Sequence, residues 1–149
     1  MCVIIDANFA HLISSSPPDI DFIPVKTWLL DKDGCLVTGG KLSEELYKLK
    51  RVKHFILTLS RAGKAKIYPF HVLNAEKSEI SKLGINCSDD LHIIALARIS
   101  GARTLCSRDK NLHKDFKNTT LINNPKGKIY QNQGHEHLLQ HTPSCEKHI

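Results

Sequence analysis

The sequence opens with Met1-Cys2-Val3-Ile4-Ile5-Asp6, a run of five apolar residues that ends at an acid. A short continuous apolar run of this kind is typical of a strand that is buried on both faces, as in a parallel sheet. Two later segments, residues 35–38 and 104–107, have a similar character. Because helical patterns separate these segments, we predict an α/β domain with a mostly parallel central sheet.

Apolar residues that recur every three or four positions predict the helices. Helices are expected at residues 8–13, 24–30, 41–59, 75–83, 91–100 and 109–116. The longest, residues 41–59, has a basic outer face. Further extended segments are expected at residues 67–72 and 121–122, and the second of these is predicted to be the last strand.

The chain has 149 residues, which is the length of one domain. We predict that residues 1–124 form this domain and that residues 125–149 form a polar, His-rich tail with a helical turn or two near residues 136–140. The 21 Lys and Arg residues exceed the 15 Asp and Glu residues by six. This net charge of +6 favours a polyanionic partner such as nucleic acid.

Several classes of protein are disfavoured by what the sequence lacks. Five cysteines without a Cys-x-x-Cys pair predict neither a disulfide framework nor a zinc ribbon, and they favour the reducing cytoplasm as the location. No apolar run approaches the roughly 20 residues that cross a bilayer, so no membrane attachment is expected. The motifs of serine hydrolases, P-loop nucleotide hydrolases and dinucleotide-binding enzymes do not occur.

Acidic residues occupy positions that a parallel sheet would bring together. Asp6 and Asp109 come just after predicted strands, whose carboxyl ends line the ligand crevice of an open parallel sheet. Asp90 opens a helix expected to pack on that sheet, and Glu44 or Glu45 lies in the first turn of the long helix. Converging carboxylates repel one another, and a divalent cation removes that cost. The acids therefore predict a site for Mg²⁺ or Mn²⁺, which could activate water for attack on a phosphate.

Three segments of the chain resemble PIN-domain nucleases. Val3-Ile4-Ile5-Asp6-Ala7-Asn8 resembles the opening strand of the family, and Leu42-Ser43-Glu44-Glu45-Leu46 resembles its early helical acid followed by Leu. The most specific segment is residues 89–112, which resembles an acid that opens an alanine-rich helix, then Gly, a strand and Thr/Ser-x-Asp. The resemblance covers residues 1–124 and implies a three-layer α/β/α sandwich that acts as a metal-dependent ribonuclease.

The resemblance also implies roles for individual residues. The residues expected to bind the metal and to be catalytic are Asp6, Glu45, Asp90 and Asp109, and those expected to support them as polar groups are Asn8 and Ser107. Leu46 favours Glu45 as the helical acid, but Glu44 stays open, since adjacent residues on a helix point about 100° apart and only one can face the site. The sequence departs from the family at Ala7, where Thr is common.

Basic residues near these acids are expected to hold the phosphate backbone of RNA. The candidates are Lys50, Lys53, Arg108 and Lys110, and a solvated surface is the alternative interpretation. Two further polar residues, His92 and Asp115, are not expected to be among the main site residues. His92 is expected to be a packed or capping side chain, and Asp115 a solvated side chain or an accessory ligand.

Two other functions compete with the ribonuclease. One is a PIN-like module that binds RNA or a protein without turnover, and the other is a nuclease of DNA flaps, which would need more acids and further helices. Many small bacterial PIN-like proteins are toxins, so the resemblance implies a toxin–antitoxin or defence role, with an antitoxin, another protein or a second copy in a homodimer as partner. A zinc site at His137, His141 and Cys145 is disfavoured because Pro143 would interrupt their helix.

Overall fold

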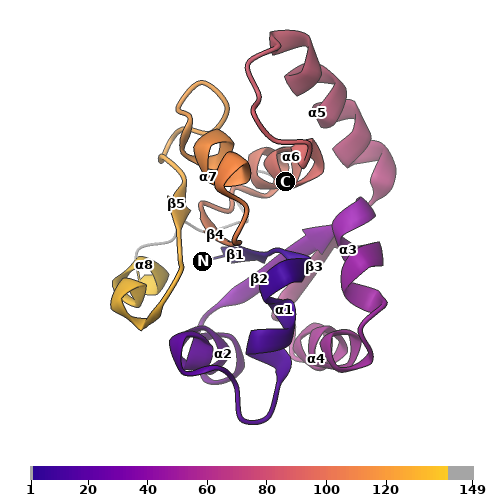
Figure 1. Ribbon diagram of the computed structural model, residues 1–149. Helices are drawn as coiled ribbons and strands as arrows, with labels where there is room; N and C mark the ends of the chain where they lie inside the picture. The colour runs from indigo at the N-terminus through magenta and orange to yellow at the C-terminus, as the bar shows by residue number, and fades with distance from the viewer. Residues whose placement is uncertain (1, 141–149) are drawn as a thin grey trace.

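A computed structural model describes residues 2–140 and contains a single five-stranded sheet (Figure 1). The strands are β1 (Cys2–Ile5), β2 (Cys35–Gly39), β3 (Ala65–Tyr68), β4 (Thr104–Cys106) and β5 (Lys128–Ile129). Their order across the sheet is β3-β2-β1-β4-β5, and every neighbouring pair is parallel. The prediction of an α/β domain with a parallel central sheet is confirmed.

Helices cover both faces of the sheet. They are α1 (Ala7–Ser14), α2 (Ile23–Asp31), α3 (Gly40–Tyr47), α4 (Lys50–Arg61), α5 (Phe70–Leu83), α6 (Leu91–Ser100), α7 (Lys110–Lys117) and α8 (His137–Gln140), with 3-10 turns η1 (Ile20–Phe22) and η2 (Gln133–His135). Figure 1 shows α1, α2 and α4 on one face and α6 and α7 on the other, with α5 packed outside α6. The architecture is thus a three-layer α/β/α sandwich. Within residues 2–140, no helix has the length and hydrophobicity that a membrane span requires.

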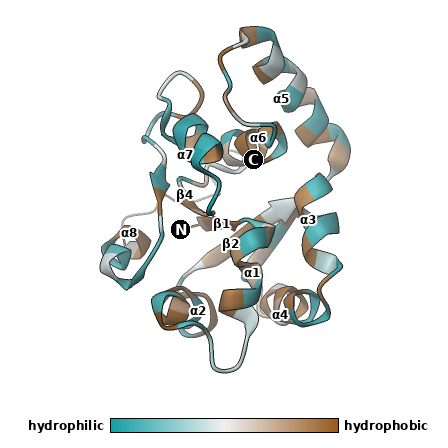
Figure 2. Cartoon of the chain, in the orientation of Figure 1, coloured by the Kyte–Doolittle hydropathy of each residue, from teal (hydrophilic) through white to brown (hydrophobic). Residues whose placement is uncertain are grey.

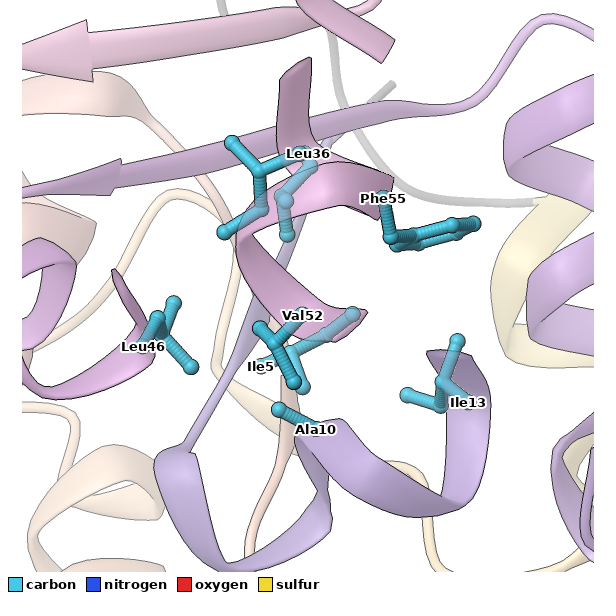
Figure 3. A pocket seen from close by; sticks show the side chains of 8 residues that line it. Ile5, Ala10, Ile13, Leu36, Leu46, Val52 and Phe55 are labelled. Carbon is cyan, nitrogen blue, oxygen red and sulfur yellow. The ribbon is translucent and has the colours of Figure 1, made fainter. Parts of the chain in front are cut away.

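The central strand β1 explains why the opening sequence is apolar throughout. All four residues of β1 are buried, because helices pack on both faces of this strand. On one face, Ile5 meets Ala10, Leu36 and Leu46 around a small apolar hollow (Figure 3). Packing of β1 in the core therefore determines where the strand ends and where Asp6 lies.

The predicted helix over residues 41–59 is wrong, because the structure has two helices there. Leu49 is extended, with φ −96° and ψ 111°, and it separates α3 from α4. A straight helix of that length would measure about 28 Å, whereas a strand of five residues spans only about 17 Å. The turn at Leu49 lets Leu46 and Val52 both be buried next to the sheet.

The last strand also differs from the prediction. Leu121 and Ile122 are buried, but their N–H groups donate to the carbonyl of Asn118 in a turn. The fifth strand is β5, where the N–H of Lys128 donates to Arg103 O and that of Tyr130 to Leu105 O. The extended segment expected at residues 67–72 is shorter and earlier, since β3 ends at Tyr68 and α5 begins at Phe70.

The described part of the predicted tail is packed into the fold. Tyr130 is fully buried, and its hydroxyl donates to the carbonyl of Asp21 at 2.6 Å. Its ring lies 5.7 Å from that of Phe22, which in turn lies 4.8 Å from that of Phe9. Leu139 of α8 is also buried. Composition predicts a peripheral segment after Asn124, whereas the structure adds a strand and core side chains from it.

The cysteines differ in state. Cys87 and Cys106 are free thiols, of which Cys106 is buried and Cys87 exposed. Cys2 is disulfide-bonded. A fully reduced chain, which a cytoplasmic location favours, therefore differs from the structure at Cys2.

Candidate functional site

Asp6 follows β1 and is held in one orientation by three donors. Its Oδ1 accepts the N–H of Ala7 at 2.8 Å and thereby caps α1. Its Oδ2 accepts the hydroxyl of Ser107 at 2.8 Å and the side-chain amide of Asn8 at 3.3 Å. Only 7% of Asp6 is exposed. The carboxylate is thus fixed at the carboxyl edge of the sheet.

Ser107 connects the ends of β1 and β4. Its Oγ donates to Asp6 and accepts the N–H of Asp109 at 3.1 Å. Its carbonyl oxygen lies 2.5 Å from Nε2 of His113 on α7. The backbone N–H of Asp6 donates to the carbonyl of Cys106 at 2.9 Å, so the two strand ends are also joined directly.

Asp109 caps the next helix in the chain, α7. Its Oδ1 accepts the N–H groups of Asn111 and Leu112, at 2.9 and 3.2 Å. A capping acid is favourable at this position, because the exposed N–H groups and the dipole of a helix N-terminus attract negative charge. One carboxylate of the site therefore also determines where α7 begins.

Asp90 is the acid on which the other three act. The pKa of Asp90 is raised to about 6, mainly by burial and then by the charge of Asp6, a hydrogen bond with Asp109 and the charges of Asp109 and Glu45. Asp6, Asp109 and Glu45 therefore lie close enough to Asp90 for their charges to act on it. Glu45 is half-buried on α3, whereas Glu44 is exposed and does not contribute to the pKa of Asp90.

A buried carboxylate behind Asp90 was not predicted. Asp115 is 1% exposed, and its two oxygens accept the N–H groups of Cys87 and Ser88, each at 2.8 Å. The Oγ of Ser88 then accepts the N–H of Asp90 at 2.9 Å.

The expectation that Asp115 is solvated or an accessory ligand is wrong, because both of its oxygens are bonded to backbone. One signal was present in the sequence, since Asp115 lies between Leu112 and Phe116 on the apolar face of α7.

In the structure, the side chains of the four acids are not positioned to coordinate one metal ion together. Among residues 2–140, no group of three or more His, Cys, Asp or Glu side chains is positioned so that it could hold a metal ion. The donor chemistry nevertheless fits a hard cation, because the four residues supply only carboxylate oxygens and Asp90 is destabilised as an anion by its neighbours.

Comparison with known proteins gives a limited result. No family model matches the chain, and no curated protein matches it. One similar solved structure is that of VapBC2 from Rickettsia felis bound to a DNA fragment from their promoter. The match has a TM-score of 0.49 and 15% sequence identity, and it covers 88% of this chain and 100% of that chain.

The four predicted phosphate-binding residues lie in two regions of the structure, α4 and the start of α7. Lys50 and Lys53 are exposed on α4, a separate helix from the one that carries Glu45. Arg108 and Lys110 are exposed beside Asp109. The guanidinium of Arg108 lies 4.9 Å from the ring centre of Phe9, and its backbone N–H donates to Oδ1 of Asn8 at 3.4 Å.

His92 is packed inside the domain. Of the two roles expected for it, packing and capping, the structure shows packing. It is 6% exposed on α6, and neither ring nitrogen has a hydrogen-bond partner. Burial lowers the pKa of His92 to about 4, with smaller contributions from Lys41 and Lys77. Of the disfavoured zinc candidates, His137 is exposed, and His141 and Cys145 lie outside the described residues.

Proposed function

We propose that this chain is a divalent-metal-dependent ribonuclease of the PIN-like kind. The observation that carries the proposal is the convergence of Asp6, Glu45, Asp90 and Asp109 at the carboxyl edge of a parallel sheet. Acids from two strand ends and two helices have no structural need to meet there. Burial is the main cause of the raised pKa of Asp90, and the charges of the other three acids raise that pKa in the same direction.

Mg²⁺ or Mn²⁺ is the cofactor that we assign to these acids. Such an ion, when bound, supplies Lewis acidity toward phosphate and water. Asp6, Glu45, Asp90 and Asp109 would hold it, which requires movement of their side chains from the positions described above. Oxygen-only donors favour these ions over zinc, which prefers His and Cys.

The surrounding residues prepare the acids for this role. Ser107 and Asn8 hold Asp6 through its Oδ2, so its carboxylate does not turn freely. Ser88 binds the N–H of Asp90 and fixes the start of α6. Arg108 carries a positive charge to the same edge, where stacking on Phe9 limits its motion. We assign this guanidinium to a phosphate next to the scissile bond, since Arg forms strong hydrogen bonds with phosphate oxygens.

The alternative is a PIN-like module that binds RNA or a protein without turnover. The observation that favours it is the lack, among the described residues, of three ligands already positioned for a metal ion. In a site that never binds metal, the four acids could only serve the stability of the fold. Their mutual repulsion argues against such a role, because it destabilises the folded protein.

We further propose a toxin or defence role with an antitoxin as partner. This proposal depends on the resemblance of residues 3–8, 42–46 and 89–112 to PIN-domain nucleases, many of which are toxins. The test is whether an adjacent reading frame encodes a small protein that co-purifies with this chain and inhibits it. Co-purification without inhibition would contradict the toxin role.

RNA cleavage tests the nuclease directly. Purified protein is incubated with structured and single-stranded RNAs in Mn²⁺, with and without EDTA. We expect cleavage in Mn²⁺ that EDTA stops, and that Asp6→Asn and Asp90→Asn each abolish, because one lost ligand weakens the whole cluster. Asp89→Asn is the matched control, since Asp89 is exposed next to Asp90 and should leave cleavage unchanged.

Three outcomes would contradict the proposal. Undiminished cleavage in EDTA, or by a folded Asp90→Asn variant, would exclude the metal mechanism. Equal losses in Asp89→Asn and Asp90→Asn would indicate a general effect of charge. Absence of cleavage on every RNA, together with no Mn²⁺ binding by calorimetry, would favour the binding module.

A further inference from the structure

Helix α7 leads from the acid cluster to a basic groove. It begins at Asp109, and its three lysines, Lys110, Lys114 and Lys117, are all exposed. Their spacings of four and three residues put them on one face of the helix. From Asp109 to Lys117 the helix extends about 12 Å. Figure 2 shows α7 as mostly hydrophilic on the face toward the viewer.

The groove lies where α7 ends against β5. It has a volume of about 410 Å³, and Lys117, Lys126 and Lys128 line it together with His135. Gly127 lies between two of these lysines and is buried against the end of α7, where an added methyl group would overlap the carbonyl of Phe116. This close approach brings the lysines of the 126–128 segment next to Lys117.

Within the described part of the chain, no acid forms an ion pair with these lysines. The two ion pairs that join described residues are Lys82–Glu79 and Arg98–Glu76, and neither includes a lysine of α7 or β5. Asp115, an acid of α7, is buried and accepts two backbone N–H groups. Among residues 2–140, these lysines therefore form no ion pair and are available to bind an external anion.

Helix α4 has no comparable connection to the site. The turn at Leu49 separates Lys50 and Lys53 from the helix that carries Glu45. Lys50 and Arg51 instead line a different groove, between α2 and α4, together with Lys26 and Phe55. A phosphate chain that leaves the acids along the surface of one helix would thus follow α7.

We propose that single-stranded RNA runs from the acid cluster along α7 into this groove, with its phosphates bound by Lys114, Lys117, Lys126 and Lys128. The proposal rests on the ribonuclease function and names the path of its substrate. None of the described residues that line the groove is Phe, Tyr or Trp. Binding there is therefore ionic and tolerant of sequence, without the base stacking that aromatic platforms provide.

The test measures binding rather than cleavage. A fluorescent single-stranded RNA of about a dozen nucleotides is titrated with the full chain in Ca²⁺, which suppresses turnover, at several salt concentrations. The variant is Lys114→Gln, Lys117→Gln, Lys128→Gln. We expect the slope of log K against log salt to fall by about 2, since each lost phosphate contact removes about 0.7 on a single strand.

Two further variants make the result specific. Lys32→Gln, Lys48→Gln, Lys82→Gln removes the same charge from exposed positions off α7 and should retain the wild-type slope. Lys50→Gln, Arg51→Gln, Lys53→Gln removes three charges from the surface of α4 and should change the slope by less than the α7 variant. Unfolding curves followed by circular dichroism check that all variants are folded.

The outcomes separate this inference from the nuclease proposal. An unchanged slope in the α7 variant, a larger loss in the α4 variant, or tighter binding of the deoxy strand of the same sequence would each overturn the inference. If the α7 variant loses slope but cleaves a dinucleotide in Mn²⁺ at the wild-type rate, the inference is supported. If it loses slope and the wild type cleaves nothing, the path is supported and the nuclease proposal fails.

Discussion

At the scale of single residues, the carboxylate of Asp115 links two parts of the site that are distant in sequence. It lies on α7, whose first turn is capped by Asp109, and it binds the backbone ahead of Asp90. Ser88 passes the constraint on to the N–H of Asp90. Asp115 is therefore a positioning residue, which holds the backbone next to Asp90 and does not itself bind the metal.

Asp115→Asn tests this role. An amide has one oxygen and one NH₂ group, so either Cys87 or Ser88 loses its acceptor. We expect a loss of roughly 1–3 kcal/mol in the free energy of unfolding, and weaker Mn²⁺ binding by calorimetry. Asp89→Asn, an exposed change in the same loop, should alter neither quantity. Mn²⁺ affinity equal to wild type would mean that Asp115 serves stability alone.

The adjacent acids of α3 provide a second test. Glu45→Gln should abolish RNA cleavage and lower the pKa of Asp90, because the charge of Glu45 raises it. Glu44→Gln should retain most of the activity, since Glu44 is exposed. Cleavage assays and NMR titration of the Asp90 carboxyl in metal-free protein measure the two effects. An inactive Glu44→Gln variant would reverse the assignment.

His92 makes stability depend on pH. The pKa of His92 is lowered to about 4 in the folded protein, against an ordinary value of 6.5. The unfolded chain therefore binds the proton first, and stability falls as the pH decreases from about 6.5 toward 4. The contribution of His92 between pH 8 and pH 5 is about 2 kcal/mol.

His92→Leu should remove this part of the pH dependence. The measurement is urea unfolding of the wild type and the variant at pH 8 and pH 5. The difference in stability between the two pH values should be smaller in the variant by about that amount. Equal pH dependence in the two proteins would show that His92 is accessible to protons in the folded state.

At the scale of elements, the contact between α7 and β5 depends on Gly127. Gly127→Ala would place a methyl group onto the carbonyl of Phe116, so the 126–128 segment must move away from α7. We expect a loss of about 1–3 kcal/mol in unfolding free energy, as for other overpacked sites. RNA binding should also weaken through separation of Lys117 from Lys128. A variant with wild-type stability would indicate that the segment moves freely.

How well the sequence predicted an element depends on what stabilises it. Strands β1, β2 and β4 are apolar runs buried in the centre of the sheet, and the sequence pattern located all three. Strand β5 was missed because backbone hydrogen bonds to Arg103 and Leu105 define it, and these leave no apolar pattern. The turn at Leu49 was missed because the apolar period continues through it. Helix α6 has the predicted bounds, and it ends at Gly101, which has a positive φ.

The same distinction applies to the site. Asp6, Asp90 and Asp109 could be found because each follows a strand or opens a helix, and such positions meet at one sheet edge. Ser88 and Asp115 could not be paired from the sequence, since 27 positions separate them and only the packing of α7 brings them together.

At the scale of the whole molecule, the row of rings Phe9, Phe22 and Tyr130 joins the beginning of the chain to its last described strand. A fragment of residues 1–124 would lose β5, Tyr130 and its bond to Asp21. We expect this fragment to be less stable than the full chain by about 3 kcal/mol or more. Thermal unfolding of the two chains measures the difference. Equal melting temperatures would support the predicted domain boundary at residue 124.

The order of strands has a consequence for how the protein is made. Strand β1 lies in the middle of the sheet and pairs on one side with β4, about a hundred residues later in the chain. Pairings over such separations form slowly, and they form late on a ribosome. Asp6 is translated about a hundred residues before Ser107, so it can accept the hydrogen bond of Ser107 only after that residue has been made. A growing chain next to ribosomal RNA therefore lacks the assembled acid cluster until Ser107 and Asp109 have been made.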